Sequence, residues 1–175
     1  MIELYTDGAR KMTGLGGWAC VIHTDKSTFF YGGFMKDITN NQSELQSVIE
    51  GLARVININE LNFDVNVYSD SSYFVHGFRE WMSIWEKRNW TRISGPKNVQ
   101  IKNLDQWKLL FEYNKKIFKI TANWVRGHNG HPENELCDRI ANYCRDHKCD
   151  IDGRVVRDSI KLEDIILSDS VIFKH

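Results

Sequence analysis

The sequence predicts an α/β fold in which a mixed sheet of five strands is flanked by helices. Three runs of aromatic and β-branched residues come first, at positions 2–7, 17–24 and 28–35. Runs with helical spacing then alternate with two further strand-like runs, at 63–69 and 118–124. This order of elements is the basis of the fold prediction.

The first third of the chain reads as three antiparallel strands followed by a helix. The second and third runs are separated by the turn-like sequence TDKS, as in a hairpin. The helix is predicted to begin near Asn41 and to end before Asn57, because apolar residues recur there at helical spacing. That apolar stripe consists of Leu45, Val48, Ile49, Leu52, Ala53 and Ile56.

The middle of the chain repeats this pattern with a shorter strand. Residues 63–69 alternate between apolar and polar side chains, as in a half-buried strand that carries Asp70 at its carboxyl end. Open α/β sheets bind their ligands at that end. Residues 71–88 and 103–115 are predicted to be helical, and residues 89–101 to form a loop.

The last core elements are a strand and a helix. Residues 118–124 alternate as a strand, and the helix starts after Pro132, whose fixed φ suits a first turn. Asp138 stands one position away from the apolar stripe of this helix, so its carboxylate can reach toward the neighbouring sheet. The stripe is formed by Cys137, Ile140, Ala141 and Cys144.

Composition sets limits on partners and location. A chain of 175 residues with a formal net charge of zero predicts one globular domain, whose nucleic-acid affinity must come from a local patch. The sequence has no signal-like segment, no 18-residue apolar run and no CxxC pair among its four cysteines. We therefore expect a reducing setting, cytosolic or nuclear, with a cytoplasmic location preferred, no membrane association and no zinc site.

Four acidic residues are candidates for one shared site: Asp7, Glu44, Asp70 and Asp138. Two carboxylates about 4 Å apart repel each other by roughly 4 kcal/mol at an effective dielectric near 20. A converging group of them therefore persists only when it is protonated or bound to metal. Such hard oxygen ligands suit Mg²⁺ or Mn²⁺.

Each of these residues also has a simpler explanation. Glu44 follows Asn41 by three positions, which fits a capping box, and Asp70 precedes two serines where it can cap the next helix. Asp7 can be a turn residue, and Asp138 a solvated helix residue. The sequence alone does not bring the four together.

Three segments, in this order, resemble the type 1 ribonuclease H family: YSDSSY at 68–73, WMSIWEKRNW at 81–90 and GHNGHPENELCD at 127–138. The resemblance implies a ribonuclease H-like catalytic domain at 1–147. Residues 148–175 lie outside it, but they are too apolar for a disordered tail. We expect this C-terminal extension to pack on the core or a partner, as two short strands.

The resemblance implies an endonuclease that hydrolyses the RNA strand of RNA/DNA hybrids and leaves 5′-phosphate and 3′-hydroxyl ends. Two Mg²⁺ ions, or Mn²⁺ in their place, would be held by Asp7, Glu44, Asp70 and Asp138. His128 would accept a proton or assist product release. Two alternatives stay open: a hybrid- or duplex-RNA-binding module that does not cut, and an integrase-like DNA nuclease. We expect the protein to be a monomer.

The resemblance also assigns contacts to both strands of the hybrid. Asn40, Asn41 and Glu44 would contact the 2′-hydroxyl that distinguishes RNA. Thr39 and Asn103 would form a pocket for a DNA phosphate. Alternatively, Asn40 and Asn41 only cap the helix that is predicted to begin near them.

A further set of residues is expected to hold the DNA strand. By resemblance, Tyr73 and Trp81 line the DNA channel, although helix packing also explains the tryptophan. The region after Trp81 is basic and contains no acidic residue between positions 87 and 102, like the basic protrusion of some family members. An ordinary solvated face is the alternative. The basic residues are Lys87, Arg88, Arg92, Lys97 and Lys102.

Overall fold

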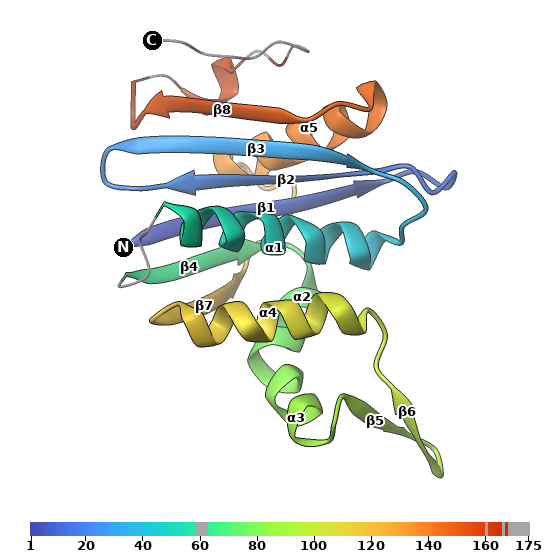
Figure 1. The fold of residues 1–175 in the computed structure, drawn as a ribbon. Helices are drawn as coiled ribbons and strands as arrows, with labels where there is room; N and C mark the ends of the chain where they lie inside the picture. Colours follow the sequence, from blue (N-terminus) through green and yellow to red (C-terminus); the bar gives the residue numbers. More distant parts are fainter. Residues whose placement is uncertain (59–62, 160, 166, 168–175) are drawn as a thin grey trace.

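Figure 1 shows the computed structural model, which describes residues 1–58, 63–159, 161–165 and 167. The predicted α/β class is confirmed, because one mixed sheet lies between helices that cover both of its faces. No helix in the described part of the chain has the length and apolar character needed to cross a membrane.

The described main sheet has six strands, so the predicted count of five was wrong. Their order across the sheet is β7-β4-β1-β2-β3-β8. Strand β1 lies inside the sheet, antiparallel to β2 and parallel to β4. The strands are β1 (Ile2–Arg10), β2 (Gly16–His23), β3 (Ser27–Met35), β4 (Asp64–Ser69), β7 (Lys119–Trp124) and β8 (Ile151–Val156).

The additional strand, β8, comes from the C-terminal extension and pairs antiparallel with β3. Its sequence IDGRVV is short and contains a glycine and charged residues, so it carries a weak strand signal. Only this strand and the 3₁₀ turn η2 (Leu162–Asp164) are formed among the described residues of the extension, where we had expected two strands. Residues 168–175 lie outside the described part.

Helices cover the two faces of the sheet. In Figure 1, α1 crosses one face beside α4, and α5 lies behind the sheet. The core between α1 and the sheet includes Leu4 and Leu45, whereas the core beneath α5 includes Ala19 and Ile140. The helices are α1 (Asn40–Asn57), α2 (Ser72–His76), α3 (Met82–Lys87), α4 (Leu104–Lys116) and α5 (Pro132–His147), with a π-helical turn η1 (Gly77–Trp81).

Helix α1 starts at a capping box formed by Thr39 and Gln42. The Thr39 hydroxyl accepts a hydrogen bond from the Gln42 amide at 3.2 Å, and the Gln42 side chain accepts one from the Thr39 amide at 2.8 Å. The predicted helix is therefore confirmed, with its first residue at Asn40. The apolar stripe faces the sheet, and Glu44 lies next to it, among the buried residues of α1.

The helical region predicted at 71–88 is present, but the π-helical turn η1 interrupts it. At Gly77 a side chain would collide with the ring of Trp107, so glycine lets this segment approach α4. The extra residue of a π turn changes the direction of the side chains that follow, and such turns are frequent at functional sites.

The loop predicted at 89–101 contains a hairpin instead. Strands β5 (Thr91–Ser94) and β6 (Lys97–Gln100) pair antiparallel and are joined through Gly95, which has φ +60°. Neither strand has a buried residue, so the hydrophobic alternation that indicates a strand is missing from the sequence. With α3, this hairpin projects away from the main sheet (Figure 1).

Candidate active site

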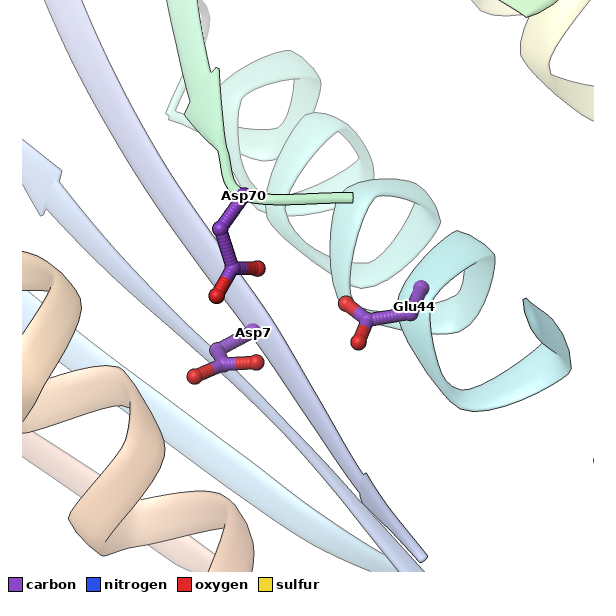
Figure 2. Close-up of side chains that lie close together, drawn as sticks. All are labelled: Asp7, Glu44 and Asp70. Carbon is purple, nitrogen blue, oxygen red and sulfur yellow. The ribbon is translucent and has the colours of Figure 1, made fainter. Parts of the chain in front are cut away.

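Three of the four acidic residues converge. Asp7 lies in β1, Glu44 in the first half of α1, and Asp70 directly after β4. One carboxylate oxygen from each lies within 4.8 Å of the others. Figure 2 shows the three side chains pointing toward one another, where α1 passes the end of β4.

The amide of Gly8 links two of these carboxylates. It donates hydrogen bonds to Asp7 Oδ1 at 2.7 Å and to Glu44 Oε2 at 3.1 Å. A Cβ at Gly8 would lie 2.6 Å from the Glu44 backbone nitrogen, so glycine permits the close approach of α1 to β1. Asp7 pairs with Ala19 inside the sheet, which rules out the alternative of a turn residue.

The two capping alternatives are also wrong. The N-terminus of α1 is capped by Thr39, and the Glu44 side chain, 7% exposed, faces the sheet instead. The next helix is capped by Ser71, whose hydroxyl accepts a hydrogen bond from the Phe74 amide at 3.2 Å. Helix capping therefore does not explain why an acidic residue stands at position 44 or at position 70.

Asp70 is held from the side of β7. The Trp124 indole nitrogen donates a hydrogen bond to the Asp70 carbonyl oxygen at 3.1 Å, although the ring is 55% exposed. A side chain at Gly127 would collide with Asp70 Oδ2, so the loop after β7 passes directly over this carboxylate. The sequence analysis missed both of these residues and Gly8, because strand alternation and single glycines do not report such contacts.

Burial and mutual repulsion disfavour the charged forms of the three acids. Burial raises the pKa of Asp7 to about 8, with further contributions from the negative charges of Asp70 and Asp138. The pKa of Glu44 is raised well above its usual range, first by burial and then by Asp7 and Asp70. Burial also raises the pKa of Asp70. A group of oxygen ligands with this electrostatic cost fits a hard divalent cation.

The fourth acidic residue, Asp138, lies outside this group. It is half-buried on α5, and its Oδ1 accepts a hydrogen bond from Asn142 Nδ2 at 2.7 Å. Its negative charge still contributes to raising the pKa values of Asp7, Glu44 and Asp70, so it lies within electrostatic range of them. The structure thus brings together three of the four predicted ligands.

His128 lies in the loop between β7 and α5. Its side chain is exposed and its backbone has φ +53°, in the left-handed region. Among the interactions of Asp70, a positive charge on His128 lowers the pKa of that carboxyl and partly offsets the effect of burial. The predicted proton acceptor therefore lies close enough to Asp70 to influence it.

Several predicted substrate-binding residues surround one hollow of about 510 Å³. It combines aromatic rings with two cationic side chains, which suits contact with nucleic acid. Asn40 is exposed at the start of α1, and Lys87 and Arg88 are exposed at the end of α3. The hollow is lined by Asn41, Tyr73, Trp81, Trp85, Arg92, Ile101 and Lys102.

The two residues predicted to bind a DNA phosphate have other contacts. Thr39 caps α1, as described above. Asn103 precedes α4 with φ +56°, and its side-chain amide donates a hydrogen bond to the Tyr73 hydroxyl at 3.2 Å. The same hydroxyl accepts a hydrogen bond from the Trp107 indole at 3.0 Å. The resemblance assigns Asn103 to a phosphate pocket and Tyr73 to the DNA channel. In the structure, a hydrogen bond joins their side chains directly.

Comparison with known proteins identifies the family. A family profile described as RNase H matches residues 1–145. A ribonuclease H from Rhodopirellula baltica is 40% identical over 143 residues, which cover 80% of this chain and 87% of that protein. One from Erythrobacter litoralis is 39% identical over 146 residues, covering 83% of this chain and 96% of that protein.

A solved structure supports the same assignment. LC9-RNase H1, described as a type 1 RNase H with the type 2 active-site motif, superposes with a TM-score of 0.75 and 27% identity. The match covers 90% of this chain and 77% of that one. The family profile, the curated relatives and the fold agree. The chain belongs to the ribonuclease H family.

Proposed function

We propose that this ribonuclease H is a metal-dependent endonuclease that hydrolyses the RNA strand of RNA/DNA hybrids and leaves 5′-phosphate and 3′-hydroxyl ends. The convergence of Asp7, Glu44 and Asp70 is the observation that carries this proposal. Buried acids whose pKa values are raised need a compensating positive charge to act as anions at neutral pH.

The proposed cofactor is a pair of Mg²⁺ ions, which Mn²⁺ can replace. Bound ions would activate a water and neutralise charge on the scissile phosphate and leaving oxygen. Asp7, Glu44 and Asp70 would hold them, with Asp138 as the fourth ligand from α5. His128, exposed beside Asp70, would accept a proton or assist product release.

The proposed substrate contacts begin at the N-terminus of α1. Asn40 and Asn41 are in the first turn of α1, one turn before Glu44, where they can address a 2′-hydroxyl beside the carboxylates. The aromatic and basic hollow that Asn41 helps to line would bind the DNA strand, with Tyr73 and Trp81 in contact with it. Lys87 and Arg88 would add phosphate contacts, and Thr39 and Asn103 a phosphate pocket.

A structural neighbour is in line with this substrate. LC11-RNase H1, whose structure was solved in complex with an RNA/DNA hybrid, has the same fold with a TM-score of 0.64 and 15% identity. The likeness shows that a chain of this fold can hold an RNA/DNA hybrid.

The deciding experiment compares end-labelled hybrid, duplex DNA and duplex RNA in Mg²⁺, in Mn²⁺ and in EDTA. We expect metal-dependent loss of only the RNA strand of the hybrid. The variant Asp70→Asn should lower the rate by about 10³-fold or more while it still binds the hybrid, because it loses a ligand charge and not the substrate contacts. Asp64→Asn, at the opposite end of β4, is the matched control and should keep the wild-type rate.

The outcomes separate the two alternatives. Hybrid binding without cleavage in any metal would identify a binding module. Cleavage of duplex DNA in preference to hybrid would identify an integrase-like nuclease. The same wild-type rate in Asp70→Asn would remove the carboxylate group from the mechanism.

We also infer a monomer in the cytoplasm. Cys20, Cys137 and Cys144 are buried and form no disulfide in the described part of the chain, in line with a reducing compartment. Light scattering of the purified protein tests the first inference, and a dimer mass would contradict it. Fractionation of the source cells tests the second.

A further inference from the structure

The carboxylate of Asp138 accepts a hydrogen bond from the side chain of Asn142 on the same helix. Asn142 lies one helical turn further along α5, and both residues are half-buried. The Asn142 Nδ2 donates one hydrogen bond to Asp138 Oδ1 at 2.7 Å and another to the Asp138 carbonyl oxygen at 2.8 Å. Both hydrogens of the side-chain amide thus have an acceptor on the same residue.

This pair of bonds fixes the orientation of the amide. If the amide of Asn142 were reversed, its oxygen would face two acceptor oxygens of Asp138, and the contact would be repulsive. The observed orientation is therefore the favourable one. It ties Oδ1 of Asp138 to α5 and leaves Oδ2 without a hydrogen bond from this residue.

The restrained carboxylate lies beside the group of three without joining it. The oxygens of Asp7, Glu44 and Asp70 lie within 4.8 Å of one another, whereas Asp138 is excluded from that set. Because its charge acts on all three carboxylates, Asp138 would supply a ligand from α5 to a second cation at the border of the group.

We propose that Asn142 is a positioning residue, which fixes the carboxylate of Asp138 so that a single oxygen remains for a divalent cation at the border of the three-carboxylate group. The inference rests on the proposed role of Asp138 as a metal ligand. A hydrogen bond to the oxygen that does not bind metal fixes the direction of the other. Loss of such a partner typically weakens metal affinity about 10- to 100-fold.

The test measures Mn²⁺ binding to the substrate-free protein by electron paramagnetic resonance and calorimetry. Asn142→Ala should weaken the lower-affinity Mn²⁺ site about 10-fold and leave the higher-affinity site unchanged. Asn142→Gln, which keeps an amide donor, should recover part of this loss. Asn114→Ala removes a half-buried helical asparagine from α4 and serves as the matched control, with wild-type binding expected.

A double-mutant cycle shows whether the effect acts through Asp138. In an Asp138→Asn background, Asn142→Ala should have no further effect on Mn²⁺ affinity. Melting temperatures measured without metal check that the variants fold. Helix propensity should not lower the stability of Asn142→Ala, because alanine favours a helix more than asparagine does.

The outcomes distinguish this inference from the proposed function. Weaker Mn²⁺ binding in Asp138→Asn, together with wild-type binding in Asn142→Ala, would overturn the role of Asn142 alone. An equal effect of Asn142→Ala in both backgrounds would also overturn it. Wild-type Mn²⁺ binding in Asp138→Asn would refute the ligand role of Asp138, and the inference would fall with it.

Discussion

The backbone amide of Gly8 donates a hydrogen bond to the side chain of Glu44, at 3.1 Å, and so joins the central strand to helix α1 inside the candidate active site. The same amide donates to Asp7, so one N–H group partly compensates two acidic side chains. Because this contact depends on the absence of a Cβ, it can be tested by a small substitution.

Gly8→Ala should lower both stability and activity. The added carbon would lie 2.6 Å from backbone atoms of Ser43 and Glu44, so α1 must shift away from β1. We expect a loss of about 1–3 kcal/mol in the free energy of unfolding, as for other overpacked sites. Urea denaturation measures the loss, and cleavage should fall at least about 10-fold because Glu44 moves. Unchanged values for both would show that α1 adjusts without cost.

The pH dependence of metal-free stability should reflect Asp7. Its pKa is 3.8 in the absence of folding effects and about 8 in the folded protein, so the folded state binds its proton more tightly. The stability from this group is fully present below the lower pKa and is lost as pH rises through the higher one. Between them, one such proton changes the free energy of unfolding by up to about 1.4 kcal/mol per pH unit.

The measurement compares wild type and Asp7→Asn in EDTA, by urea denaturation between pH 4 and pH 8. The variant should lose less stability as pH rises, and the difference between the two proteins reports Asp7 together with the part of the raised Glu44 pKa that the Asp7 charge causes. Mg²⁺ at pH 8 should raise the melting temperature of wild type more than that of the variant. Equal slopes for both proteins would contradict the raised pKa.

His128→Ala should slow single-turnover cleavage by about 10²-fold, the lower end of the range for lost proton transfer. The loss should stay smaller than that of Asp70→Asn, since the carboxylate group is intact. His131→Ala is the matched control, because His131 is also exposed and makes no side-chain cap at the start of α5. A loss in His128→Ala as large as that in Asp70→Asn would assign His128 a different role.

Replacement of both Lys87 and Arg88 by alanine should weaken hybrid binding and reduce its salt dependence. Each lost phosphate contact reduces the slope of log affinity against log salt concentration by about 1. This slope is measured by fluorescence anisotropy at several salt concentrations between about 50 and 200 mM. The double replacement of Lys115 and Lys116, which are exposed at the far end of α4, should leave the slope unchanged. A wild-type slope in the first variant would identify an ordinary solvated face.

Elements with a buried face could be predicted from the sequence. In α1 and β4 the apolar spacing follows the helical and strand periods, because one side of each element contacts the core. In contrast, β5 and β6 have no buried residue, so no period marks them as strands. The same reason explains why their hairpin was predicted as a loop.

The candidate site was predictable by residue type but not by geometry. Motifs indicated which acids to consider, and three of them meet within 4.8 Å. That Asp138 accepts a hydrogen bond from Asn142 and lies outside the group of three depends on side-chain rotamers, which no sequence pattern specifies. Close approaches at Gly8 and Gly127 depend on packing between segments that are distant in the chain.

The strand β8 has a consequence for self-association. It occupies the hydrogen-bonding edge of β3, a strand that carries Phe29, Phe30 and Tyr31 in succession. A chain cut before residue 151 would present that aromatic edge to solvent, and an exposed edge of this kind is a template for pairing with another molecule. Strand β8 is itself the last strand of the described sheet, so it replaces the edge of β3 by a shorter edge that carries exposed Asp152 and Arg154, and short charged edges disfavour pairing with neighbouring copies.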